Sequence, residues 1–253
     1  MKRFVFILLA SLSFLRPAAQ DVTALVKEAD RLEAIPDEVA AFEKFKEVLK
    51  IKPTNIHALS KASELCSRIG KRQKDHALRD SYYAAAKTYA ETALKVDPNS
   101  AEASCSMAIA LGRSTMSKTG KEKIENAKEI RKYIDIALKA NPNYFLAWHV
   151  LGRWHYEISG LNFFERSVVK LFYGGLPAAS YKESVAAFER SEALTPGFIL
   201  NNYELARAYN RNGENEKAIT TLKRLLTMPN HTEDDPAIKE DSKKMLVVLE
   251  KYQ

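Results

Sequence analysis

Apolar side chains recur along this chain with the period of an α-helix, and five of the apolar segments end in a turn that contains proline. The turns carry Pro53, Pro98, Pro142, Pro196 and Pro229. Proline lacks an amide donor and forces the preceding residue out of helical geometry, so each turn marks the end of a helix. The pattern therefore predicts an all-α chain in which five helices end in the same way.

Each of these helices carries a stripe of three residues ahead of its proline, which we interpret as a small–large–small pattern that is clearest at Ser184, Phe188 and Ser191. The spacing i, i+4, i+7 places each stripe on one helix face. Small side chains allow a second helix to approach closely, and the large one fills the remaining space. The stripes are Ala41, Phe45, Val48; Ala86, Ala90, Ala93; Ile130, Ile134, Ala137; Ser184, Phe188, Ser191; and Ala218, Leu222, Leu225.

A partner helix precedes each stripe, most clearly around Leu151-Gly152 and around Leu205 and Tyr209. Pairs of this kind are typical of degenerate tetratricopeptide repeats. We expect a right-handed α-solenoid of about five such pairs over residues 20–253, the alternative being a helical bundle without repeats. The expected repeats cover about 22–55, 56–99, 100–143, 144–197 and 198–231.

The last segment of the chain has the pattern of a helix that closes such a stack. Asp235 is a good N-cap residue, and Pro236 suits the first helical position. The segment 236–252 is apolar on one side, with Ile238, Met245 and Leu249. We therefore predict a capping helix at 236–252, because the last pair of a solenoid otherwise leaves an apolar face exposed.

An additional helix is predicted at 162–173, inside the fourth repeat. Asn162 followed by Glu165 is a suitable helix start. The apolar residues after it are Phe163, Phe164, Val168, Leu171 and Phe172. This helix could be an extra core helix, a lid across a groove, or a helix that lies on a membrane surface. A core or lid role is favoured, because the polar side is short and only weakly basic.

Residues 1–19 have the pattern of a secretory signal peptide. Lys2 and Arg3 precede the apolar run 4–15, which is short for a membrane span, and Pro17-Ala18-Ala19 supplies small residues. We therefore expect a protein exported to the periplasm or secreted, the alternative being a membrane anchor through residues 4–15. Without residues 1–19, which carry three basic and no acidic side chains, the formal net charge falls from +7 to +4. Nothing in this balance indicates nucleic acid as a partner.

The sequence does not indicate catalysis. We find no phosphate-binding glycine loop, no paired CxxC and no HExxH, so neither a cofactor nor a metal is predicted. Cys66 and Cys105 are expected to be buried thiols, with a disulfide as the alternative. His149 and His155 are six residues apart and so lie on different helix faces, and His155 is expected in the core.

Several sequence segments in the C-terminal half resemble the regulator of microtubule dynamics family. These are 152–157 (GRWHYE), 161–166 (LNFFER), 171–174 (LFYG), 177–181 (PAASY) and 230–235 (NHTEDD). The resemblance is dense over 142–246 and consists mostly of repeat spacing over 22–141. It implies a helical repeat domain of this size. Members of the family are implicated in microtubule association, and one in phospholipid binding through its repeat domain.

The first helices of successive repeats line the concave face of such a solenoid, and an arginine recurs on this face in four repeats. Arginine binds carboxylate or phosphate in a planar, bidentate manner that lysine does not reproduce. Aromatic neighbours add surface for the apolar part of a ligand. The expected groove residues are Arg68, Arg113, His149, Arg153, Tyr156, Tyr203, Arg207, Asn210 and Arg211.

We therefore predict a non-catalytic scaffold that binds a protein or peptide with acidic or carboxylate groups in this groove. A phospholipid-binding or membrane-contact protein that uses the same groove is the main alternative. A cytosolic regulator of the cytoskeleton is a third, which requires that residues 1–19 do not direct export. Microtubules enter as a partner only through the family resemblance.

Overall fold

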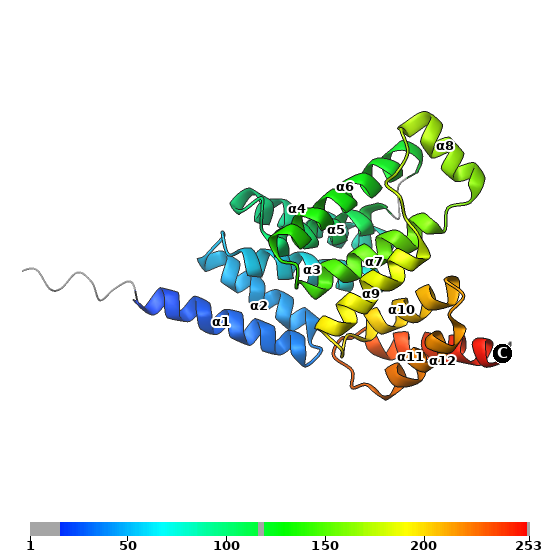
Figure 1. Cartoon of the computed structure of the whole chain (residues 1–253). Coiled ribbons are helices and arrows are strands. Elements are labelled where there is room, and N and C mark those ends of the chain that lie inside the picture. The colour runs from blue at the N-terminus through cyan, green and yellow to red at the C-terminus, as the bar shows by residue number, and fades with distance from the viewer. Residues whose placement is uncertain (1–15, 116–118, 252–253) are drawn as a thin grey trace, which may run out of the picture.

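A computed structural model of the chain describes residues 16–115 and 119–251. Within these ranges it consists of twelve α-helices joined by turns, and it has no β-strand (Figure 1). None of the described helices has both the length and the apolar character needed to cross a bilayer. The all-α fold predicted from the sequence is confirmed. The expected signal segment lies mostly outside the described residues, and the first helix already begins at Arg16.

The helices form five pairs, each made of an inner helix followed by an outer one. Each outer helix also packs against the inner helix of the next pair, and most successive inner helices contact one another. The inner helices are α1 (Arg16–Ala34), α3 (Ile56–Arg72), α5 (Ala101–Thr115), α7 (Phe145–Ser159) and α10 (Ile199–Arg211). The outer helices are α2 (Glu38–Ile51), α4 (His76–Val96), α6 (Gly120–Ala140), α9 (Tyr181–Leu194) and α11 (Asn215–Thr227). Helix α12 (Asp235–Lys251) covers the last pair, and α8 (Phe163–Tyr173) is inserted between α7 and α9.

Local side-chain contacts fix where the helices begin and end. The carboxylate of Asp75 accepts a hydrogen bond from the amide of Leu78 at 2.7 Å and so caps the start of α4. Helix α2 ends at Ile51, two residues before Pro53, where the missing amide prevents another turn. The proline stands next to the helix end that it determines, which is why the sequence pattern predicts where the outer helices end.

The stripes that precede the prolines form the interface between the two helices of each pair. Phe45, Phe188 and Leu222 are all completely buried. In the fourth pair the side chain of Ser184 donates to the carbonyl of Gly152 at 2.8 Å. A Cβ on Gly152 would lie 2.7 Å from the ring of Phe188, so α7 and α9 pack at a distance that only glycine permits. The small and large positions therefore have the packing roles that their sizes suggest.

The two cysteines and His155 lie in the interior. Cys66 and Cys105 are buried and free, and burial raises the pKa of the Cys66 thiol to about 12. Two inert, buried thiols result. His155 is 5% exposed and its Nδ1 lies 3.4 Å from a carboxylate oxygen of Glu183.

The loop between α11 and α12 returns to the first two repeats, so that the two ends of the stack touch (Figure 1). The carboxylate of Glu233 accepts from the amide of Glu38 at 2.9 Å. Arg72, at the end of α3, pairs with Glu233 at 3.1 Å and with Asp234 at 3.3 Å. Lys71 also pairs with Asp234 at 3.3 Å. The loop thus ties the C-terminal repeat to α2 and α3, which are far from it in the sequence.

The expected role of Asp235 as an N-cap is wrong. Its carboxylate turns back and accepts hydrogen bonds from the amides of His231 and Thr232 at 2.7 and 2.8 Å, and from the Thr232 hydroxyl at 2.7 Å. These donors precede α12, which itself begins at Asp235. The residue therefore shapes the loop that contacts α3 and does not satisfy the free amides of the helix.

The expected core or lid role of the inserted helix is also wrong. Phe163, Phe164, Leu171 and Phe172 of α8 are 87%, 73%, 78% and 69% exposed. The helix contacts α6, an outer helix, and projects from the edge of the stack away from the inner helices (Figure 1). Sequence periodicity identified its apolar side correctly, but this side points away from the protein.

Candidate ligand groove

Most of the predicted groove residues lie on the surface formed by the inner helices, which we call the inner face. Arg68 lies on α3, Arg113 on α5 and Arg153 on α7. Tyr203 and Arg207 follow on α10. The helices that carry them are successive neighbours in the stack, because α3 packs on α5, α5 on α7 and α7 on α10.

At the N-terminal end of the inner face, the guanidinium of Arg68 is already bound. Its Nη2 lies 2.7 Å from Glu33 of α1, and its Nε lies 3.2 Å from Glu38, which is completely buried. Glu33 also pairs with Lys61 at 3.1 Å. The pKa of Glu33 is lowered, because Lys61 and Arg68 together outweigh the effect of its burial. Arg68 is therefore held in an ionic network and is less available to an anionic ligand.

A recess of about 420 Å³ opens beside this network. Residues of α1 and α3 line one side, and His231 and Thr232 of the returning loop line the other. The acidic residues of that loop, Glu233 and Asp234, neutralise Arg72 next to it. The protein thus places its own carboxylates where the sequence alone indicated a basic surface.

Around the centre of the inner face, two arginines bind a buried carboxylate, and a third arginine, Arg113, lies close enough for their charges to act on it. Glu204 of α10 is 4% exposed and lies 2.7 Å from Arg207 and 3.4 Å from Arg153. Arg153 also contacts Glu157, which is well exposed, at 3.5 Å. Arg113 makes no ion pair with any residue in the described part of the chain; burial lowers its pKa, and the nearby charge of Arg153 lowers it further. We call Arg113, Arg153, Arg207 and Glu204 the central cluster; its positive charge exceeds its negative charge by two.

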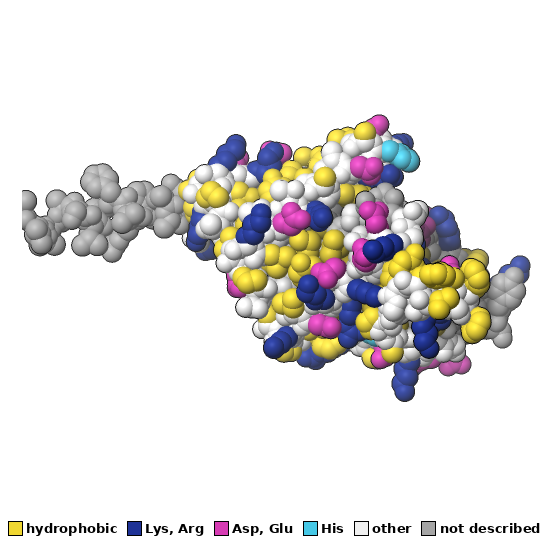
Figure 2. Space-filling view, turned by 90° about the horizontal axis from the view of Figure 1, so that it is seen from above, with side chains coloured by type: hydrophobic (Ala, Val, Ile, Leu, Met, Phe, Trp, Pro, Cys, Tyr) yellow, Lys and Arg dark blue, Asp and Glu magenta, His cyan; other side chains and the backbone are white. Residues whose placement is uncertain are grey.

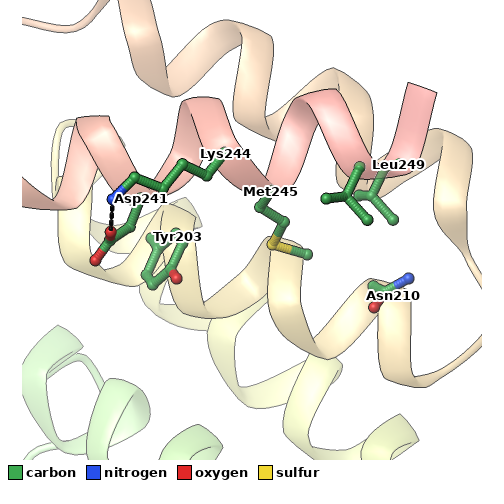
Figure 3. Close-up of a pocket in the computed structure, with 7 residues that line it drawn as sticks. Tyr203, Asn210, Asp241, Lys244, Met245 and Leu249 are labelled. Atoms are coloured by element: carbon green, nitrogen blue, oxygen red, sulfur yellow. Dashed lines mark hydrogen bonds and ion pairs between the residues drawn. The ribbon is translucent and has the colours of Figure 1, made fainter. Parts of the chain in front are cut away.

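Aromatic rings extend the central cluster toward the end of the stack. The guanidinium of Arg207 lies over the ring of Tyr156 at 4.6 Å and within 5.9 Å of Tyr203. Stacking of this kind orients a guanidinium and leaves its edge free to donate hydrogen bonds. Tyr203 then borders a recess of about 370 Å³ between α10 and α12 (Figure 3).

This second recess combines apolar and polar side chains. Figure 3 shows Met245 and Leu249 of α12 lying opposite Tyr203 and Asn210 of α10. The amide of Asn210 donates to Asn215 at 2.9 Å, which fixes its orientation. The recess is therefore a place for an apolar group, beside the aromatic end of the central cluster.

Two predicted groove residues have other roles. His149 is 4% exposed and lies beneath the inner face, between the rings of Phe188 and Phe198, with its Nδ1 3.1 Å from Asn201. Burial lowers its pKa to about 4, so it is neutral at physiological pH. The prediction that His149 lines the groove is wrong, because α10 covers it. Arg211 is exposed at the end of α10 and donates to the hydroxyl of Tyr181 at 2.8 Å, away from Glu204.

The helical spacing that places the arginines on one face does not reveal their acidic partners. These partners are Glu33, Glu38, Glu204 and Asp234. The sequence separation between each carboxylate and the arginine that it binds ranges from 3 to 162 positions. One local signal existed: Glu204 and Arg207 are three apart on one helix, a spacing at which opposite charges meet. The long-range pairs depend on the curvature of the stack, which no local pattern encodes.

Five stacked helix pairs, a closing helix and an inner face lined with charged and aromatic side chains define a tetratricopeptide-like binding scaffold. Scaffolds of this kind typically act by binding and not by catalysis. Residues 25–252 match the sequence model of the family described as Regulator of microtubule dynamics protein 1-3, and the chain belongs to this family.

Similar proteins agree with this assignment. The chain is 25% identical over 241 residues to regulator of microtubule dynamics protein 3 of Bos taurus, and the match covers 92% of this chain and 50% of that protein. It is 30% identical over 158 residues to protein 3 of Xenopus laevis, covering 62% of this chain and 34% of that protein. The chain thus spans about half, or less, of the length of these relatives.

A solved structure supports the fold. The chain superposes on a thermophilic TPR protein of Thermus thermophilus with a TM-score of 0.65, over 89% of this chain and 99% of that protein. The two sequences are 14% identical, so the similarity concerns the fold alone. The solenoid of helix pairs predicted from the sequence is confirmed.

Proposed function

We propose that the chain is a non-catalytic scaffold that binds a protein or peptide through acidic groups, and that the central cluster is where those groups bind. The observation that carries the proposal is the shortage of carboxylates around Arg113, Arg153 and Arg207. Among the described residues, Glu204 is the buried carboxylate at their centre, and its contact with Arg153 is long at 3.4 Å. A carboxylate from a partner would complete the hydrogen bonding of Arg113 and Arg153.

The N-terminal end of the inner face contributes less to this function. Arg68 and Arg72 are bound by Glu33, Glu38, Glu233 and Asp234. A partner would have to displace these carboxylates before it could reach the guanidinium groups. The proposed contact is therefore a short acidic segment over α5, α7 and α10, and not one that follows the whole length of the stack.

A fluorescence anisotropy titration tests the proposal. The probe is a fluorescein-labelled peptide of six glutamates, with a peptide of six glutamines as its uncharged control. Replacement of both Arg113 and Arg153 by Gln is expected to weaken binding of the acidic peptide by about tenfold or more, since a hydrogen bond to a charged group contributes roughly 1.5 to 3 kcal/mol. The matched control is Arg190→Gln, because Arg190 is exposed on the outer helix α9.

Equal binding of the acidic peptide by wild type and by the double variant would refute the assignment of the central cluster. The relatives are named for microtubule dynamics, so microtubules are one acidic partner to test in the same way. Co-sedimentation of wild type and of the double variant with microtubules is expected to differ only if microtubules bind at this cluster.

A lipid phosphate is the second candidate for the same anionic position. The recess beside Tyr203 favours it, because Met245, Val248 and Leu249 offer an apolar surface next to Arg207. Short-chain phosphatidate added to the titration separates the two candidates. If phosphatidate competes with the acidic peptide in wild type but not in Met245→Glu, which alters the recess, the result would support lipid binding. Competition that Met245→Glu leaves unchanged would indicate that the phosphate alone is recognised.

A further inference from the structure

Helix α8 presents its apolar side to the solvent. At about 100° per residue, Phe163, Phe164, Leu171 and Phe172 share one half of the helix surface. All four are at least 69% exposed, whereas Val169, on the opposite half, is buried at 7%. Figure 2 shows hydrophobic side chains gathered at the end of the molecule that carries α8, with Lys and Arg side chains beside them. Exposed aromatic groups that cluster in this way indicate a binding surface.

Polar contacts hold the helix in this orientation. Its first turn is closed by a capping box, in which Asn162 and Glu165 each accept from the other's backbone amide. The guanidinium of Arg166 donates to the carbonyls of Ile158, Ser159 and Leu161 at 2.8 to 3.2 Å and so anchors α8 to the end of α7.

The other end of α8 is fixed as well. Lys128 of α6 donates to the carbonyl of Tyr173 at 2.6 Å. Gly174 follows with a left-handed backbone (φ 71°) and ends the helix. Rotation of the apolar side into the protein would break these contacts and those of Arg166. The outward direction of the four side chains is therefore a fixed feature of the fold.

The size and charge of this surface fit a lipid bilayer better than a second copy of the chain. The four side chains expose roughly 600 Å² in total, given that an aromatic side chain buries 150 to 250 Å². A stable protein interface needs about 800 Å² on each partner. A convex surface made by one short helix meets that requirement poorly, but a bilayer deforms around it. Lys170 is exposed beside the apolar half, and the chain carries an excess of positive charge.

We propose that α8 is an interfacial helix that inserts Phe163, Phe164, Leu171 and Phe172 below the headgroups of an anionic bilayer. With eleven residues it is about 16 Å long and lies in the interface without crossing it. Lys170 at the edge of the apolar half contacts lipid phosphates. This function is separate from the central cluster on the inner face, which stays open to a partner while α8 binds the membrane.

Vesicle flotation of the full chain tests this proposal. The vesicles contain phosphatidylcholine with about 30% phosphatidylserine, an anionic surface of the kind that attracts basic groups. Replacement of the four apolar side chains of α8 by Ser is expected to weaken vesicle binding by about tenfold or more, because binding scales with the inserted apolar area. The matched control replaces Ile35, Ile51, Leu78 and Val247, four exposed apolar residues elsewhere, by Ser. Both variants keep residues 4–15, so any contribution of that segment is the same in both.

A second measurement reports insertion directly and does not depend on how the fourfold variant folds. Lipids brominated on their acyl chains should quench the fluorescence of the tryptophan introduced by Phe164→Trp. The quenching should be stronger than that of the tryptophan introduced by Val39→Trp on α2. Equal flotation of the α8 and control variants, or no additional quenching for Phe164→Trp, would overturn the proposal. So would sedimentation velocity that shows α8-dependent dimers without vesicle binding, since the occupant would then be a second copy.

Discussion

Because α7 packs closely against α9, we expect the same Gly→Ala substitution to change the free energy of unfolding in opposite directions at two helical glycines. Gly152 and Gly112 both lie in inner helices, yet a Cβ on Gly152 would meet three atoms of the Phe188 ring at 2.7 to 2.8 Å, and a Cβ on Gly112 would meet nothing within 4 Å. In an α-helix, Gly→Ala by itself stabilises by about 0.5 to 1 kcal/mol. Gly112→Ala should therefore raise the free energy of unfolding by about that amount.

Gly152→Ala should have the opposite effect. Phe188 is completely buried and cannot move without disturbing its neighbours, and overpacking a core typically costs about 1 to 3 kcal/mol. Subtracting the gain in helix propensity leaves a net loss of about 1 to 2 kcal/mol. The two variants should differ by about 2 kcal/mol, or roughly 4 to 8 °C in Tm for a domain of this size.

Urea unfolding followed by circular dichroism at 222 nm measures both variants against wild type. The sign of the change is the decisive result, because the same chemical substitution is made in both helices. If Gly152→Ala were as stable as Gly112→Ala, the close approach of α7 and α9 would be wrong, and with it the assignment of Gly152 to the small position of the repeat.

Three further predictions concern charge. Hydrogen bonding to Glu102 and to Asp30 raises the pKa of His57 to about 9, above its value near 6.5 in the unfolded chain. The stability that His57 contributes is therefore complete below pH 6.5 and is lost as the pH rises through 9. Urea titrations at pH 6 and pH 10 should show this loss in wild type and not in His57→Gln. Burial lowers the pKa of His149 to about 4, so its neutral form stabilises the fold above pH 6.5. This contribution to stability is lost as the pH falls from 6.5 to 4. An NMR titration that gave the His149 ring a pKa near 6.5 would contradict its burial. The double variant Glu233→Gln, Asp234→Asn should release the returning loop from Arg72 and Lys71 and lower the free energy of unfolding by about 1 to 2 kcal/mol. Hydrogen exchange at the amides of residues 230–235 should then become faster. Unchanged exchange would argue against this contact.

Local sequence patterns predict the architecture well, because helix ends and packing stripes are encoded within a few residues. Of the fifteen stripe residues, Ile130 alone is only partly buried. The prolines, caps and small residues act on their own helix or on its immediate partner. Consistent signals of this kind at several levels are what specify a fold.

The state of the inner face could not be predicted in the same way. Helical spacing places Arg68 and Arg153 on this surface, but whether they are free depends on carboxylates that come from other repeats. The curvature of the stack brings Glu33 to Arg68 and Asp234 to Arg72. His149 shows the same limit, because α10 covers it through contacts with Phe198 and Asn201.

Helix α8 illustrates a different limit. Its amphipathic pattern is clear in the sequence, but amphipathicity does not say which side faces the protein. The contacts of Arg166 with the end of α7 decide that question, and they place the aromatic side outward. The short and weakly basic polar side favours burial when only the sequence is considered. In the fold, Arg166 on that side instead holds the helix in place.

We propose that Arg113, Arg153 and Arg207 lack enough carboxylates and that Glu204 partly occupies the position at which they would bind a partner. The most direct test is the affinity of the six-glutamate peptide for Glu204→Gln, compared with Glu216→Gln on the exposed surface of α11. Removing a competing charge beside the bound carboxylate should tighten binding about fivefold. We expect this gain for Glu204→Gln and little change for Glu216→Gln. Equal or weaker binding by a folded Glu204→Gln protein would contradict it.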